Sequence, residues 1–167
     1  AMSAVSPQAS PDERELFERL SLEAFQSGLS WITILRKRPA FRAAFAGFDP
    51  AVVADFDETD VQRLMADAGI VRNRMKIDAT IANARALLAL HAQGQQLADV
   101  FEAHRPATRD VRPNSFAKVP ASTAESVALA KHLKRLGFRF VGPTTAYAAM
   151  QALGYVDDHL AGCLVVQ

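Results

Sequence analysis

The stretch Leu22-Glu23-Ala24-Phe25-Gln26-Ser27-Gly28-Leu29-Ser30-Trp31 decides how this chain is interpreted, because it sets one carboxylate inside an apolar helical run. Burying a carboxylate beside leucine and phenylalanine side chains is costly unless a polar or cationic group meets it. Gly28 ends the predicted helix, and Ser30 caps a second helix that begins at Trp31, the only tryptophan. Glu23 is then either a functional carboxylate or a salt-bridged surface residue, and Trp31 is either a stacking side chain or part of the core.

Helical spacing of apolar residues continues along most of the chain, and strand-type alternation is scarce. Ser10-Pro11-Asp12-Glu13 has the form of a helix start, with a capping serine, a first-turn proline and a capping-box glutamate. The pattern predicts the all-α fold class, as a single compact helical domain over residues 10–167 behind a flexible tail over 1–9. The predicted helices are 11–27, 31–38 (ended by Pro39), 41–45, one opening at Asp49-Pro50, 60–66 (capped by Thr59), 74–91, 122–136 and 144–153, with an irregular loop over 103–121.

The composition of the 167-residue chain limits its class. Half of the residues are apolar, which suffices for one sizeable core, and a formal net charge of +1 does not by itself indicate a nucleic-acid partner. The single cysteine excludes an internal disulfide and fits a reducing compartment. No apolar run reaches membrane-spanning length, and no signal-peptide pattern is present. We therefore expect a cytoplasmic protein without a membrane partner, with the monomer as the default state.

The segment around Gly69 has the form helix, short apolar turn, helix, with Arg72, Arg74 and Lys76 directly after the turn. A glycine lets backbone amides approach a ligand closely, and the amino terminus of the following helix favours an anion. A DNA phosphate is the anion that these basic residues would bind, as in a helix-hairpin-helix element. The alternative is an ordinary helical hairpin whose charges are solvated.

The pair His159 and Cys163 has the one-turn spacing of two zinc ligands. Zinc requires three or four protein ligands, and the chain has no second cysteine. Cys163 is therefore equally readable as a buried apolar side chain.

Several separate motifs together resemble the 3-methyladenine DNA glycosylase I family. The similarity runs in order from roughly Leu16 to Cys163, and its motifs are 22–35, Asp67-Ala68-Gly69-Ile70 with Lys76-Ile77, Asn83-Ala84-Arg85, Phe140-Val141-Gly142 through Met150-Gln151-Ala152, Asp158-His159 and Cys163. The resemblance implies an all-helical member of the helix-hairpin-helix glycosylase superfamily. It also implies base-excision repair, in which N3-methylated adenine is removed from alkylated double-stranded DNA by hydrolysis of the N-glycosidic bond.

The resemblance also implies roles for individual residues. Glu23 matches the pocket glutamate that contacts the flipped base and would be the catalytic residue, and Trp31 matches the tryptophan that stacks on that base. Gly28 and Leu29 match the loop that meets the DNA around the lesion, and Leu29 is the candidate wedge for the gap in the duplex. The turn at Gly69, with Arg72 and Lys76, would bind phosphates.

For a metal, the resemblance implies that His159 and Cys163 are two of four zinc ligands. Family members carry the other two, with a tyrosine and a tryptophan of the base pocket, in an amino-terminal segment containing Cys-Gly-Trp and Tyr-His-Asp motifs. Neither motif occurs before Ser10. Zinc is therefore only a possible cofactor, and the expectation is either a truncated chain or a divergent branch.

Taken together, these patterns predict a monofunctional glycosylase, because the stretch Ala79–Gly94 contains no aspartate to support a lysine nucleophile such as Lys76. Two alternatives stay open. The first is a catalytically impaired glycosylase-like module that binds DNA lesions without excising the base. The second is a helical protein-interaction domain with no nucleic-acid role, whose DNA affinity would be absent or insensitive to salt.

Overall fold

The computed structural model describes residues 11–26, 28–106 and 122–155. All regular structure in these ranges is helical, which confirms the all-α fold class. No helix in them is long and apolar enough to cross a membrane. The elements are α1 (Pro11–Gln26), α2 (Trp31–Ala44), the 3-10 helix η1 (Ala46–Phe48), α3 (Pro50–Val53), α4 (Glu58–Met65), α5 (Arg74–Ala92), α6 (Leu97–Ala103), α7 (Ala124–Arg135) and α8 (Pro143–Ala152).

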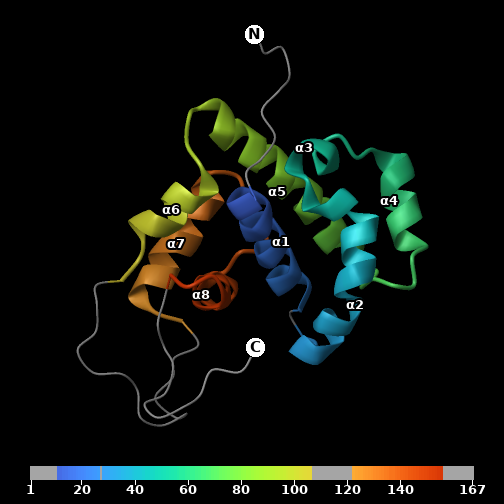
Figure 1. Ribbon diagram of the computed structural model, residues 1–167, viewed down its shortest axis with the longest axis horizontal. Coiled ribbons are helices and arrows are strands. Elements are labelled where there is room, and N and C mark those ends of the chain that lie inside the picture. Colours follow the sequence, from blue (N-terminus) through green and yellow to red (C-terminus); the bar gives the residue numbers. More distant parts are fainter. Residues whose placement is uncertain (1–10, 27, 107–121, 156–167) are drawn as a thin grey trace.

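Helix α1 lies at the centre of the molecule (Figure 1). Helices α6, α7 and α8 lie on one side of it, helices α2, α3 and α4 lie on the other, and α5 runs across both groups. Helix α1 contacts α2, α5, α6, α8 and η1, so the helix is held from several directions. Its carboxyl-terminal end lies against α5 through Phe25 and Lys76. That end carries the Glu23 segment.

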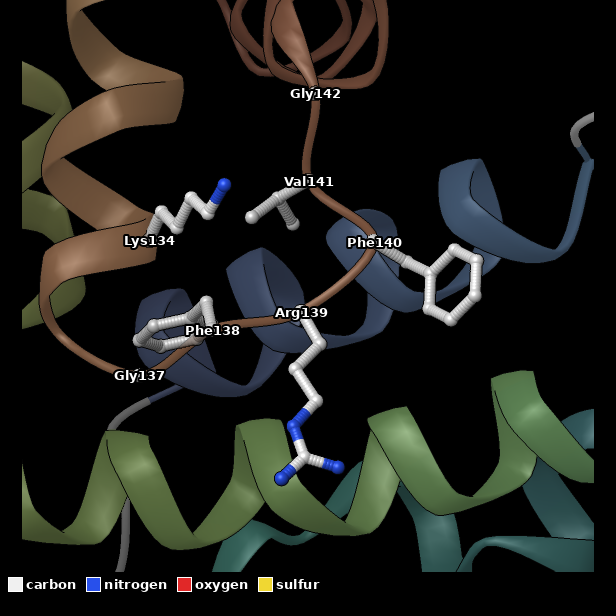
Figure 2. Close-up of a pocket in the computed structure, with 7 residues that line it drawn as sticks. All are labelled: Lys134, Gly137, Phe138, Arg139, Phe140, Val141 and Gly142. Carbon is white, nitrogen blue, oxygen red and sulfur yellow. The ribbon is translucent and has the colours of Figure 1, made fainter.

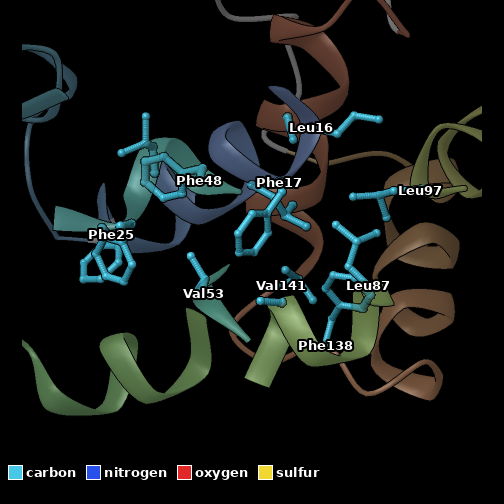
Figure 3. Packing of buried hydrophobic residues seen from close by; sticks show 14 of the residues in the cluster. Leu16, Phe17, Phe25, Phe48, Val53, Leu87, Leu97, Phe138 and Val141 are labelled. Carbon is cyan, nitrogen blue, oxygen red and sulfur yellow. The ribbon is translucent and has the colours of Figure 1, made fainter. Parts of the chain in front are cut away.

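One continuous apolar core surrounds α1, and phenylalanine side chains dominate its centre (Figure 3). Phe17 and Phe25 of α1 are fully buried, and the Phe25 ring lies 4.9 Å from the ring of Phe41, between centroids. The stack continues through Phe45 to Phe48, whose ring centroids are 5.5 Å apart. Tilted and stacked aromatic pairs of this kind add to the stabilisation from burial alone. The core therefore joins α1 firmly to α2 and η1.

Helix α1 also buries carboxylates, and that of Glu13 has polar partners on two other helices. Glu13 is only 1% exposed and accepts hydrogen bonds from the amides of Leu97 at 2.7 Å and Ala98 at 2.8 Å, at the start of α6. Its Oε1 also lies 2.6 Å from His91 Nε2. Anions at a helix amino terminus satisfy amides that have no partner within the helix. Glu13 therefore ties the start of α1 to α5 and α6.

Two of the predicted helix limits are wrong. Pro39 does not end the second helix, because α2 continues through it to Ala44. Proline removes one backbone hydrogen bond and disfavours the helix interior. Here the continuous helix buries Phe41 and lets Arg38 and Arg42 both bind the buried carboxylate of Glu18, with Arg42 Nε 2.6 Å from Glu18 Oε2. Tertiary contacts thus outweigh the local cost of the proline.

The second wrong limit concerns α4, whose cap is Asp57 rather than Thr59. Asp57 and Asp60 form a reciprocal capping box, in which each side chain accepts the backbone N–H of the other residue. The short helix α6 was not predicted from the sequence. The separate helix predicted over 41–45 is part of α2, which runs on to Ala44. The Asp49-Pro50 start of α3 and the Thr123 cap of α7 agree with prediction.

We predict that Glu13→Ala lowers the free energy of unfolding by about 3 kcal/mol, because it leaves buried amides at the start of α6 without their acceptor. Urea denaturation followed by circular dichroism measures the change. The matched control is Glu15→Ala, an exposed position on the same helix, for which a change within about 0.5 kcal/mol is expected. Equal stabilities of the two variants would contradict the prediction.

Candidate functional site

Glu23, Arg19 and Trp31 form one cluster at the carboxyl-terminal end of α1. Glu23 is 7% exposed, and its Oε2 accepts a hydrogen bond from Arg19 Nε at 2.9 Å. The guanidinium carbon of Arg19 lies 4.3 Å from the centre of the Trp31 ring, in cation–π contact. The structure thus brings the two predicted residues, Glu23 and Trp31, to either side of one arginine. The sequence analysis missed Arg19, although its four-residue spacing from Glu23 on a helix was a usable signal.

Burial and charge pairing act in opposite directions on the Glu23 carboxyl. Burial raises its pKa above the usual range, and the neighbouring Arg19 guanidinium offsets only part of that rise. The carboxylate also lies close to the end of α1, where the negative end of the helix dipole is located. A cationic partner therefore stabilises the charged form of Glu23, as the sequence indicated.

The turn after α1 presents apolar side chains to solvent. Gly28 has a φ of 82°, a left-handed conformation that favours glycine, and a side chain there would meet open space. Leu29 is 39% exposed and Ile32, one turn further on, is 51% exposed. Large apolar side chains exposed together at a turn indicate a contact surface. Leu29 thus has the exposure that the predicted wedge requires.

The amino terminus of α5 lies against this end of α1. Lys76 Nζ donates to the backbone oxygen of Phe25 at 3.4 Å, and burial lowers the pKa of the Lys76 amine. Asn73 caps α5 by accepting the Lys76 amide at 3.1 Å. Met75, next to it, is exposed. Lys76 therefore links the start of α5 to the last turn of α1, the turn that follows Glu23.

The turn at Gly69 joins α4 to α5 and packs against α2. The Gly69 amide donates to Asp67 Oδ1 at 2.8 Å, and a Cβ at this position would come within 2.8 Å of the Ala40 Cβ. Glycine is thus required here for close packing against α2. The phosphate contact expected of the Gly69 turn stays a prediction, as does that of Arg72, which is exposed after the turn.

A second helical hairpin, between α7 and α8, presents a more open turn (Figure 2). A hollow of about 630 Å³ is lined by Lys134 and residues 137–142. Gly137 has a φ of 99°, and Phe140 is an exposed phenylalanine with a φ of 58°. Gly142 precedes Pro143 at the start of α8 and is exposed. The sequence carried a signal for this turn, since a basic helix end, two glycines and a first-turn proline follow one another, and Phe140-Val141-Gly142 is one of the motifs of the family resemblance.

Asn83 of α5 fixes the middle of this turn. Its Oδ1 accepts the Arg139 amide at 2.7 Å, and its Nδ2 donates to the Arg139 carbonyl at 3.0 Å. The Asn83 side chain is buried, so both bonds are shielded from water. In Figure 2 the Arg139 side chain extends towards α5, whereas Lys134 and Val141 approach each other across the hollow.

The predicted zinc ligands His159 and Cys163 lie outside the described residues. Within the described ranges, no three histidine, cysteine, aspartate or glutamate side chains are grouped closely enough to hold a metal ion.

Comparison with known proteins identifies this arrangement. The family model for methyladenine glycosylase matches residues 6–166. This chain belongs to the methyladenine glycosylase family. It is 48% identical over 155 residues to the DNA-3-methyladenine glycosylase 1 of Escherichia coli K12, covering 91% of this chain and 82% of that protein. It is 44% identical to the Haemophilus influenzae DNA-3-methyladenine glycosylase, covering 91% of this chain and 83% of the relative.

Solved structures of this family agree with the fold. A crystal structure of 3-methyladenine DNA glycosylase I superposes with a TM-score of 0.87 at 48% identity, covering 92% of this chain and 85% of the other. The Staphylococcus aureus enzyme, solved to explain its recognition of 3-methyladenine, superposes with a TM-score of 0.83 at 33% identity, covering 96% and 86%. The family resemblance inferred from the sequence is thus confirmed.

We predict that Asn83→Ala lowers the free energy of unfolding by about 2 kcal/mol and loosens the α7–α8 turn, because the Arg139 amide and carbonyl lose their buried partners. Amide hydrogen exchange over residues 137–142 measures the loosening, with α4 as the internal reference. Asn83→Asp keeps the acceptor oxygen but not the donor, and an intermediate exchange rate is expected. Unchanged exchange in both variants would contradict the role of Asn83.

Proposed function

We propose that this chain is a monofunctional DNA-3-methyladenine glycosylase, which hydrolyses the N-glycosidic bond of 3-methyladenine in alkylated DNA. The observation that carries the proposal is that the buried Glu23 carboxylate and the Trp31 ring contact the same cation, the Arg19 guanidinium. A position between a buried anion and an aromatic face suits a planar cation better than any neutral base. Membership of the methyladenine glycosylase family supports the same assignment.

Glu23 and Trp31 would recognise the base after it leaves the duplex. Methylation at N3 gives the adenine of the nucleotide a formal positive charge, and a damaged base costs less to unstack than a normal one. Trp31 would stack on the purine ring, and the ionised Glu23 would hydrogen-bond its edge. The site would therefore select a base that is both positively charged and planar.

The same carboxylate would assist bond cleavage. The electron pair of the N-glycosidic bond stays on the departing base, which leaves C1′ of the sugar as a neutral molecule. Positive charge therefore shifts to the sugar, where the Glu23 carboxylate offsets it electrostatically. Water then adds to C1′ and releases a proton to solvent. No lysine adduct is required, which agrees with the lack of an aspartate over residues 79–94.

Double-stranded DNA would lie across the end of α1. Leu29 would fill the gap left by the flipped base, because it is exposed at the turn after Glu23. Arg72, after the Gly69 turn, and Lys134, beside the α7–α8 turn, would neutralise phosphates. Action as a monomer, in the cytoplasm, belongs to the same proposal. Zinc at His159 and Cys163 would be structural, and no step above depends on it.

Glu23→Gln tests the central role of the carboxylate. The amide keeps the shape and hydrogen-bonding capacity but not the charge, so release of 3-methyladenine from methylated duplex should fall at least about a hundredfold. Binding to an abasic duplex should stay within about twofold, because phosphate contacts dominate it. The control is Glu15→Gln on the exposed face of α1, which should release base at the wild-type rate. Unchanged release by Glu23→Gln would remove this residue from the mechanism.

The wild-type protein in the same assay separates the enzyme from the lesion-binding alternative. Free 3-methyladenine, with the DNA strand intact until alkali treatment, supports a monofunctional enzyme. Gel retardation of methylated DNA without released base would support a binding module instead.

The DNA surface is tested by Lys134→Gln and Arg72→Gln. Each variant should weaken binding to duplex DNA and reduce the slope of log affinity against log salt by about one. Fluorescence anisotropy at several salt concentrations gives both quantities. Arg105→Gln is the control, since Arg105 already pairs with Glu102 at 2.6 Å, and its slope should match the wild type. If neither Lys134→Gln nor Arg72→Gln alters the slope, DNA does not cross this surface.

A further inference from the structure

We propose that Arg19 is a specificity-determining residue that holds the base position between Glu23 and Trp31 until a flipped base displaces it. The inference rests on the proposed function. Arg19 has no part in the sequence motifs or in the proposed reaction.

The two contacts of Arg19 are those that a methylated adenine needs. Its guanidinium is a planar, delocalised cation, as is an N3-methylated adenine in DNA. One contact is the 2.9 Å hydrogen bond to the Glu23 carboxylate. The other is the position over the Trp31 ring, 4.3 Å from its centre. Arg19 therefore presents the charge and the flat surface of the substrate in the place where the substrate would bind.

Arg19 and the base cannot both occupy this face of Trp31. An aromatic ring stacked on the indole would lie at a spacing of about 3.5 Å, within the space that the guanidinium now fills. The Arg19 side chain is 22% exposed, in contrast to the buried Glu23, so it has a path towards solvent. Entry of a base thus requires rotation of the arginine side chain rather than movement of α1.

This exchange favours a cationic base. Displacing Arg19 breaks both contacts whichever base enters, and it leaves Glu23 buried without its partner. A neutral purine restores only the stacking. A purine made cationic by alkylation restores the stacking and the pairing with Glu23. Arg19 therefore sets a threshold that undamaged bases do not reach, and between encounters it pairs with the buried Glu23 carboxylate.

Binding of two small probes to the wild type and to Arg19→Ala tests the exchange. One probe is 3,9-dimethyladeninium, a permanent cation with a methyl group in place of the sugar, and the other is neutral 9-methyladenine. Trp31 is the only tryptophan, so its fluorescence reports occupancy of this site. Removing the competing side chain should tighten binding of the cation by about tenfold. Binding of 9-methyladenine should become measurable only in the variant.

The matched control is Arg105→Ala. Arg105 also pairs with a glutamate, Glu102, and lies 4.9 Å over an aromatic ring, that of Tyr155. This substitution removes the same kind of contacts elsewhere, and probe affinity should equal that of the wild type. Arg19→Gln is the second variant, because it keeps a donor towards Glu23 without the charge or the guanidinium plane. The same gain is expected of it.

The outcomes separate this inference from the proposed function. Equal or weaker probe binding by both Arg19 variants, including no detectable binding by any of the proteins, overturns the role of Arg19. A gain in probe affinity supports it, even if the wild type releases no 3-methyladenine from methylated DNA, a result that would overturn only the proposed function. Base release by the wild type without a gain in the Arg19 variants overturns only the inference.

Discussion

The burial of carboxylates on the central helix is the constraint on which the rest of this structure depends. Glu13, Glu18 and Glu23 lie on α1, and each is less than a tenth exposed. A buried carboxylate is unfavourable unless hydrogen bonds or cations compensate for the water it has lost. Glu13 meets the amides of α6, Glu18 meets two arginines of α2, and Glu23 meets Arg19 of its own helix.

These three pairings differ in what they can do. The partners of Glu13 and Glu18 come from other helices, so breaking either pair would disturb the packing of the fold. The partner of Glu23 comes from the preceding turn of the same helix, and the contact between elements that its departure would remove is that with the Trp31 ring of α2. Only this third carboxylate is free to exchange one cation for another, and it lies beside the exposed turn at Leu29.

Much of the helical fold could be predicted from the sequence, because caps such as Thr123 and first-turn prolines such as Pro143 act locally. The limits at Pro39 were not predictable in this way, since the gain from Phe41 and from the arginines around Glu18 is a tertiary effect. The positions of Glu23 and Trp31 were predicted, but the arginine between them was not. The close packing of Gly69 against Ala40 was not predictable, because a glycine required for packing looks the same in sequence as one required for an anion.

The partners of Glu13 have a consequence for the order of folding during synthesis. Leu97 and Ala98 lie 84 and 85 residues further along the chain. When α1 leaves the ribosome, about half of the protein must still be made before the Glu13 carboxylate reaches the amides that donate to it. The central helix therefore cannot become fully buried early, and a nascent chain that stops short of α6 retains a charged residue where the finished core excludes water.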